Sequence, residues 1–147
     1  MKQLFTGLAL ALALLSVGCG TSSNKNSNNV SGNWTATLTG NNASQNFAFT
    51  LTMFQNSDNS VSVTNLQFTT ASPCFGSGAT ASGGFSVSGD FNGNATGALT
   101  LLVQSNTTTN NTLTLNGTLN NNNTISGTWV LAGGSGCTGS GNFNMIR

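Results

Sequence analysis

The chain has 147 residues, of which 37% are apolar and only 3% are charged, and its formal net charge at pH 7 is +1. This length suits one domain with a single buried core. No cluster of Lys and Arg is present to neutralise phosphates, which argues against nucleic-acid binding. Phe, Leu, Val and Trp recur among the many Asn, Ser and Thr residues, so the composition favours a folded domain over a disordered chain.

Residues 1–18 have the organisation of a secretory signal peptide. Lys2 supplies the positive start, residues 8–15 form an uninterrupted run of Leu and Ala, and small or apolar residues lead to Gly18. The apolar run is too short to span a bilayer comfortably as a helix. Cys19 then lies where a signal peptidase would cut, so the sequence predicts export and cleavage before Cys19.

The sequence LSVGC, which ends at Cys19, resembles the lipobox of bacterial lipoproteins. The resemblance implies that Cys19 becomes the acylated first residue of the mature protein and that several acyl chains anchor it stably in a membrane. Gly20 follows the cysteine, which implies sorting to the outer membrane where the host has two membranes. Residues 19–29 are then the acylated cysteine and a flexible polar tether. The alternative is an ordinary signal peptide that is followed by a chance cysteine.

The two remaining cysteines, Cys74 and Cys137, lie in segments rich in Gly and Ser. An exported chain enters an oxidising compartment, so we expect a disulfide between them. A zinc site needs more ligands than two cysteines in a chain without histidine, and we expect no metal. A reactive thiol pair is the other alternative, although no cationic residue lies nearby in sequence to lower a thiol pKa.

From residue 30 onward the apolar residues recur with a period of two, which is typical of strands that are buried on one face. Val61 and Val63 have one parity whereas Leu66 and Phe68 have the other, so we expect a bulge or a break near Asn65. No segment has a convincing helical pattern. The predicted strands are residues 33–40, 46–54, 60–69, 85–89, 95–103, 112–119, 124–132 and 141–146.

Short turn-forming segments separate these strands, which predicts antiparallel neighbours in chain order. The predicted fold of residues 30–147 is therefore all-β, an up-and-down eight-stranded β-barrel, with a two-sheet β-sandwich as the alternative. Glycines recur at matching places in two hairpins, where they indicate bends or close packing beneath large neighbours. The side chains that we expect to face inward, as core or as ligand-lining residues, are Trp34, Phe49, Leu99, Leu115 and Trp129.

The sequence SGNW, residues 31–34, opens the first predicted strand and resembles the Gly-any-Trp signature of lipocalin-like barrels. Arg147 follows the last strand, near the place where such folds often carry a basic side chain over that tryptophan. The resemblance implies a barrel in which Arg147 covers Trp34. Independently of it, we expect Trp34 to serve as a core anchor rather than a ligand contact.

The residues that catalysis needs are scarce, because the chain has no His and no Tyr, and its two acidic residues are Asp58 and Asp90. Both lie in sequences typical of turns, where an Asp accepts backbone hydrogen bonds. The hydroxyl groups lack a base to activate them. We therefore expect a protein that is not an enzyme and has no cofactor.

Two classes of function remain for a lipid-anchored envelope barrel. In the first, the barrel interior holds a small apolar molecule close to the membrane. In the second, the domain is a structural or surface component whose exterior, rich in Asn and Thr, binds a protein or a glycan. A cavity of several hundred cubic ångströms would favour the first class, and a filled core with an exposed aromatic patch would favour the second.

Overall fold

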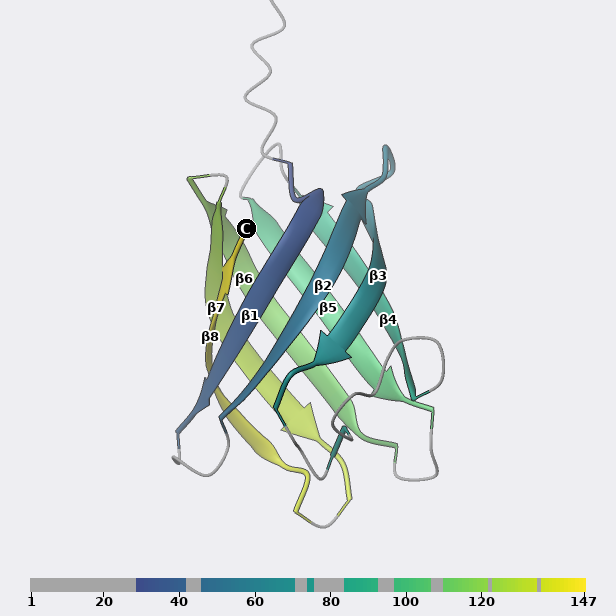
Figure 1. Cartoon of the computed structure of the whole chain (residues 1–147), viewed down its shortest axis with the longest axis vertical. Helices are drawn as coiled ribbons and strands as arrows, with labels where there is room; N and C mark the ends of the chain where they lie inside the picture. Colours follow the sequence, from purple (N-terminus) through teal and green to yellow (C-terminus); the bar gives the residue numbers. More distant parts are fainter. Residues whose placement is uncertain are drawn as a thin grey trace, which may run out of the picture.

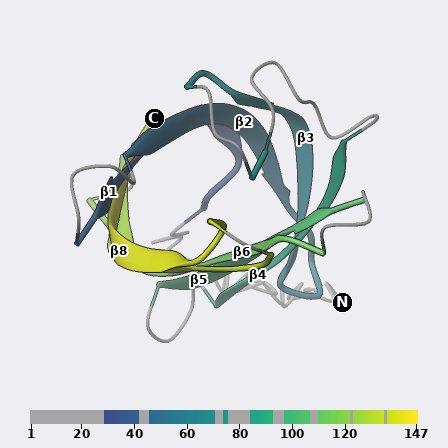
Figure 2. The ribbon, with the colours of Figure 1, turned by 90° about the horizontal axis from the view of Figure 1, so that it is seen from below.

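Eight antiparallel strands form a closed barrel in the computed structural model of the chain, in the order β1 to β8, and β8 pairs with β1 (Figure 1, Figure 2). The predicted barrel is confirmed, and the sandwich alternative is wrong. The structure describes residues 29–41, 46–70, 74–75, 84–92, 97–106, 110–121, 123–134 and 136–147. The strands are β1 (Gly32–Gly40), β2 (Phe47–Gln55), β3 (Ser60–Phe68), β4 (Phe85–Asn92), β5 (Ala98–Ser105), β6 (Thr112–Asn120), β7 (Thr124–Ala132) and β8 (Gly139–Ile146).

The alternation of apolar and polar residues decides which side of each strand faces the core. In β1 the side chains of Trp34, Ala36 and Leu38 are buried, whereas Thr35 and Thr37 between them are exposed. Successive side chains of a strand point to opposite faces, so this order places every second residue inside the barrel. The outer surface of the strands consequently consists mostly of hydroxyl and amide side chains.

The predicted irregularity near Asn65 is a β-bulge in β3. The pairing of β2 with β3 shifts between Thr50 and Thr52, and Asn65 adopts a left-handed backbone conformation with φ of 50°. A bulge adds one residue to one strand and so reverses the parity of the residues that follow it. This shift allows Val61 and Leu66, which are five residues apart, both to be buried.

Glycines in the strand interiors permit close packing inside the barrel. Gly117 of β6 pairs with Gly127 of β7, and a Cβ atom at Gly117 would lie 2.6 Å from Cζ of Phe143. A Cβ atom at Gly127 would overlap the carbonyl oxygen of Asn116. The expectation of close packing beneath a large neighbour is confirmed at Gly117, where the missing side chain makes room for the Phe143 ring.

The contact between β3 and β4 is the weakest part of the strand ladder. Only Ser60–Asp90 and Val61–Gly89 are paired, and the two strands diverge beyond them (Figure 1). Phe75, from the connection between these strands, is buried beside the gap. Its ring stacks on Phe68 with centroids 4.9 Å apart, and it meets the Phe85 ring edge-on at 6.2 Å.

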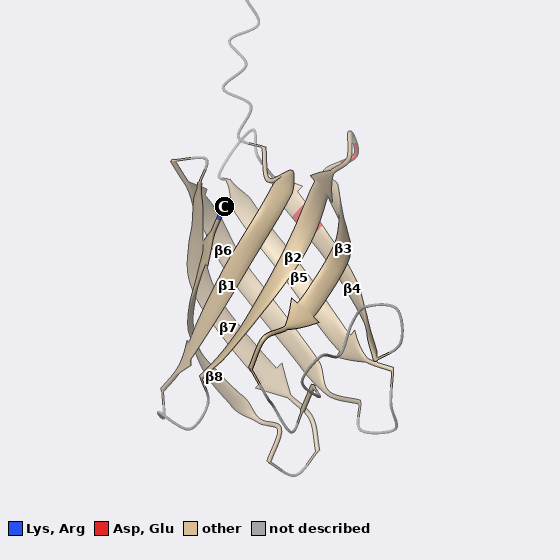
Figure 3. Cartoon of the chain, viewed as in Figure 1, with Lys and Arg blue, Asp and Glu red and all other residues tan. Residues whose placement is uncertain are grey.

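The two ends of the barrel differ in their connections and in charge. The end where β1 begins and β8 finishes, which we call the Arg147 end, carries the β2–β3 turn at residues 56–59. The opposite end, which we call the disulfide end, carries the longer β3–β4 connection with Cys74. All charged side chains that the structure describes, Asp58, Asp90 and Arg147, lie toward the Arg147 end (Figure 3).

Candidate functional site

The barrel interior is filled at every position that the sequence predicted to face inward. Trp34, Leu99 and Trp129 are 1% exposed, and Phe49 and Leu115 are 0% exposed. A side chain that borders even a water-sized space exposes part of its surface to that space, so these values mean that protein atoms pack around all five residues. Their inward orientation is confirmed and their side chains belong to the packed core, although Trp34 and Leu99 also line hollows on the outer surface.

The indole of Trp129 is held by polar as well as apolar contacts. Its Nε1 donates hydrogen bonds to the carbonyl oxygens of Thr39 (3.2 Å) and Asn142 (3.1 Å), and the ring of Phe47 meets it edge-on at 5.1 Å. A buried indole N–H needs such an acceptor. Trp129 therefore connects β7 to β1 and β8 inside the barrel.

Trp34 and Arg147 close the other end of the core. Nε1 of Trp34 donates a 2.8 Å hydrogen bond to the carbonyl oxygen of Val30, and Cζ of Arg147 lies 5.1 Å from the centroid of the indole. Nη1 of Arg147 donates to the carbonyl oxygens of Ser31 (2.8 Å) and Asn29 (3.1 Å). The expectation that a basic side chain covers Trp34 is confirmed.

Gly32, two residues before Trp34, has a backbone conformation that favours glycine. Its φ is +142°, and a Cβ atom there would lie 2.8 Å from Cδ of Arg147. A residue with a side chain would be strained in this backbone conformation and would also push Arg147 off the indole. The glycine, the tryptophan and the arginine thus act as one structural unit.

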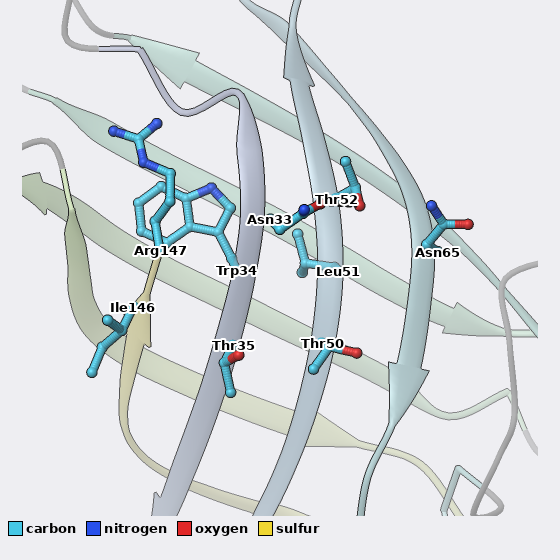
Figure 4. A pocket seen from close by; sticks show the side chains of 9 residues that line it. All are labelled: Asn33, Trp34, Thr35, Thr50, Leu51, Thr52, Asn65, Ile146 and Arg147. Carbon is cyan, nitrogen blue, oxygen red and sulfur yellow. Dashed lines mark hydrogen bonds between the residues drawn. The ribbon is translucent and has the colours of Figure 1, made fainter.

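A hollow of about 270 Å³ lies beside this unit, across the outer surface of β1, β2 and β3 (Figure 4). Five of its nine lining residues are Thr or Asn, although most of the exposed wall is apolar, and Oγ1 of Thr52 donates a 2.7 Å hydrogen bond to Oδ1 of Asn33. The bulge contributes Asn65 to the far side. The lining residues are Asn33, Trp34, Thr35, Thr50, Leu51, Thr52, Asn65, Ile146 and Arg147.

A second hollow, of about 360 Å³, lies on the outer surface of β5, β6 and β7. Gly117 and Gly127 form part of it, and Oγ1 of Thr100 donates a 3.1 Å hydrogen bond to Oδ1 of Asn116 within it. The glycines were predicted from the sequence as packing positions, but neither hollow was predicted, because Thr and Asn residues like those that line the hollows recur along every strand.

The disulfide between Cys74 and Cys137 is present, with Cα atoms 5.5 Å apart, as predicted. Beside it lies Asn111, which is the one polar side chain that is buried in the described residues. Its Nδ2 donates to the carbonyl oxygen of Cys74 (3.1 Å), and its Oδ1 accepts from the backbone N–H of Gly134 (3.2 Å). The disulfide and Asn111 together fasten the β3–β4 connection to the β7–β8 connection. The role of Asn111 was not predicted from the sequence.

The two acidic residues lie in different settings. Asp58 is in the β2–β3 turn, where its Oδ1 accepts from the hydroxyl (2.6 Å) and the backbone N–H (3.0 Å) of Ser60, and these bonds lower the pKa of its carboxyl group. Asp90 lies within β4, so its assignment to a turn is wrong; β4 continues to Asn92 because Phe91 faces inward and is buried. Within the described ranges, no three His, Cys, Asp or Glu side chains form a group that could hold a metal ion.

Comparisons with known proteins identify no relative of this chain. No protein-family model, no curated protein and no solved structure matches it. Cys19, the predicted site of acylation, lies outside the described residues. Among the residues that are described, no helix is long and apolar enough to cross a membrane. The candidate functional site is therefore defined by geometry alone, as the hollow beside Trp34 and Arg147.

Proposed function

We propose that this protein is a lipid-anchored component of the bacterial envelope that binds an uncharged glycan on the outer surface of its barrel. The proposal joins three elements, which are an acylated Cys19, a filled barrel and a hollow beside Trp34. It includes no catalytic step and no cofactor. The observation that carries it is the hollow on the outer surface beside Trp34, next to core side chains that are packed on the described strands.

The anchor and the compartment rest on the sequence and on the disulfide. The signal-like residues 1–18 and the lipobox-like sequence before Cys19 support acylation, and Gly20 supports sorting to the outer membrane. Disulfides persist in exported proteins and are rare in the cytosol. The bond between Cys74 and Cys137 is thus consistent with an envelope location.

The hollow beside Trp34 lies on the outer surface of the barrel, among outward Thr and Asn side chains. Trp34, Phe49 and Leu115 fill the interior with exposures of 0–1%, whereas the 270 Å³ hollow opens on a surface of Thr and Asn side chains. A small apolar ligand inside the barrel would have to displace packed side chains, each of which contributes to folding stability. A ligand in the hollow would displace only water.

The chemistry of the hollow suits a neutral sugar. Thr hydroxyls and Asn amides both donate and accept hydrogen bonds, as do the hydroxyl and acetamide groups of a glycan. Arg147 supplies the only charge among the lining residues, and its Nη1 is already bonded to backbone carbonyl oxygens. A strongly anionic ligand would therefore meet little opposing charge, which favours an uncharged partner.

The test uses a neutral N-acetylglucosamine oligosaccharide, titrated into the ¹⁵N-labelled full chain and followed by NMR. We expect backbone amide shifts that cluster at Thr35, Thr50 and Thr52. Thr35→Val combined with Thr50→Val removes two hydroxyls without a change of shape and should abolish these shifts. Thr37→Val, on the same strand but outside the hollow, is the matched control and should leave them intact. Shifts that are absent, or that persist in the double variant, would contradict the proposal.

One observation favours a second candidate, in which the barrel retains a small apolar molecule. Val63 and Val87 pack against the core but are only partly buried, and they lie on the two strands that diverge between β3 and β4. An apolar chain that entered between these strands would meet them first. Fluorescence of a fatty acid probe should then increase on binding and should lose that increase with Val87→Asp; no binding by the wild-type chain would dismiss this candidate.

A further inference from the structure

In the described part of the chain three large apolar side chains are exposed, and two of them lie toward the Arg147 end of the barrel. Phe54, in the last part of β2, is 52% exposed, and Ile146, the last residue of β8, is 56% exposed. The third, Val130, is 50% exposed and lies near the end of β7, toward the disulfide end. Single exposed apolar residues are common, so exposure alone assigns no role to these side chains.

The segment that leads to residue 29 joins the barrel at this same end, and hydrogen bonds hold its junction. The carbonyl oxygen of Asn29 accepts a hydrogen bond from Arg147, and Val30 is 0% exposed. The backbone N–H of Val30 donates to Oε1 of Gln55 (3.3 Å), and the backbone N–H of Gln55 donates to Oγ of Ser31 (3.0 Å). The place where this segment leaves the barrel is therefore held on β2 and by Arg147.

The length of chain before this junction limits how far the barrel stands from an anchor at Cys19. Asn29 lies ten positions after Cys19. A fully extended chain of that length spans at most about 35 Å. A flexible chain has a root-mean-square length of about 18 Å. A flexible tether of that length keeps the Arg147 end, where it joins the barrel, closer on average to an anchor at Cys19 than the disulfide end.

We infer that the Arg147 end rests directly on the lipid surface, with Phe54 and Ile146 inserted among the lipid headgroups and the disulfide end directed away from the bilayer. This inference rests on the proposed anchor at Cys19. Exposed apolar side chains gain by leaving water at such an interface, and the short tether supplies a high local concentration of lipid. The hollow beside Trp34, which Ile146 also lines, then opens at the edge of the headgroup layer.

Charge indicates which lipid surface fits. Asp58 and Asp90 lie toward this end, and Arg147 is the single described cation there. With Lys25 in the segment that leads to the barrel, two carboxylates are balanced by two cations and the formal charge on this side is zero, so an anionic bilayer offers no electrostatic gain over a zwitterionic one. The partner surface that we infer is therefore an uncharged or zwitterionic lipid layer.

The experiment uses the acylated protein, purified from membranes and reconstituted in phosphatidylcholine vesicles. A fluorophore is attached to Ser57→Cys in the β2–β3 turn or, in a second sample, to Ala132→Cys at the disulfide end; both positions are exposed. Lipids with a spin label on the headgroup then report which label is near the bilayer. We expect quenching at position 57 and none at position 132.

The roles of the two apolar side chains are tested in the same vesicles. Phe54→Ser combined with Ile146→Ser should reduce the quenching at position 57, whereas Val130→Ser, the matched control, should not change it. Equal quenching at both positions, stronger quenching at position 132, or no effect of the double variant would overturn the inference. Flotation with the vesicles separates the two proposals, because a protein that does not float lacks the anchor itself, whereas a protein that floats without the expected quenching contradicts only the orientation.

Discussion

Arg147 covers the indole of Trp34 and at the same time holds the backbone that precedes β1. Its Cζ lies 5.1 Å from the ring centroid, and its Nη1 donates to the carbonyl oxygens of Asn29 and Ser31. The last described residue of the chain thus fastens the first described residues across the closure between β8 and β1. Loss of this one side chain removes a cation–π contact and two hydrogen bonds together.

The first prediction concerns this closure. Arg147→Met keeps much of the apolar stem but removes the guanidinium, and it should lower the free energy of unfolding by about 1–2 kcal/mol. Arg147→Lys keeps the charge without the planar group, so its free energy of unfolding should lie between those of Arg147→Met and the wild type. Urea denaturation followed by tryptophan fluorescence measures both values. A methionine variant as stable as the wild type would show that the contact with Trp34 has no energetic role.

The second prediction tests the filled core at Trp34. Trp34→Ala should lower the free energy of unfolding by about 3–5 kcal/mol, because the site is packed on all sides and cannot collapse fully. In the wild-type chain, both indoles are 1% exposed and should resist quenching by aqueous iodide. Full quenching of both indoles in the folded protein would contradict the inward placement of the tryptophans.

The third prediction concerns the disulfide end. Cys74→Ala combined with Cys137→Ala should lower the free energy of unfolding by on the order of 4 kcal/mol. Asn111→Ala should lower it by about 1–3 kcal/mol, since it removes the side chain that bonds both the carbonyl oxygen of Cys74 and the N–H of Gly134. The triple variant should lose less than the sum, because the disulfide and Asn111 hold the same connection. Thermal denaturation of all three variants measures the coupling free energy between the disulfide and Asn111. If the losses add exactly, the disulfide and Asn111 stabilise the protein independently, which would contradict this prediction.

The fourth prediction compares two glycines. Gly117→Ala should lower the free energy of unfolding by about 1–3 kcal/mol, because the new Cβ would meet the ring of Phe143. Gly134→Ala is the matched control, since a Cβ there meets nothing within 4 Å, and its effect should stay within about 0.5 kcal/mol. Equal stabilities of the two variants would mean that Phe143 moves aside at no cost.

The fifth prediction concerns pH. The chain has no His, no Tyr and no Glu, and Cys74 and Cys137 are bonded. We therefore expect the free energy of unfolding to stay nearly constant from about pH 5 to pH 9.

At acidic pH, Asp58 should make the free energy of unfolding depend on pH. Hydrogen bonds from the side chain and backbone of Ser60 lower its pKa from an ordinary value of 3.8. A lowered pKa in the folded state stabilises the protein above pH 3.8, and this contribution is lost as the pH falls through the lowered value. The Asp58→Asn variant should therefore lose less of its free energy of unfolding on acidification than the wild type does. A stability that changes steeply near neutral pH would contradict this prediction.

Much of the fold could be predicted from the sequence because buried and exposed residues alternate along the strands of the barrel. The period of two identified all eight strands and the inward positions of Trp34, Phe49 and Trp129. The change of parity after Val63 located the bulge at Asn65. These features are local, and a local pattern of apolar residues is sufficient to predict them.

Other features depend on contacts that no local pattern reports. Phe75 is a single apolar residue in a polar connection, and its stacking on Phe68 follows from the place where β3 and β4 diverge. Asn111 is one of many asparagines, and only the fold brings it to the disulfide. Asp90 looked like a turn residue because Asn and Gly follow it, but burial of the adjacent Phe91 extends the strand. The hollow beside Trp34 could not be predicted, because outward Thr and Asn residues recur on every strand.

The most direct test of the account is the intact mass of the protein extracted from its native membrane and measured under conditions that retain bound molecules. The account predicts a chain that begins at Cys19 and carries acyl groups, contains one disulfide between Cys74 and Cys137, and retains no apolar ligand within the barrel. A chain that still includes residues 1–18, an unmodified Cys19, or a lipid bound in stoichiometric amount to the barrel would contradict it.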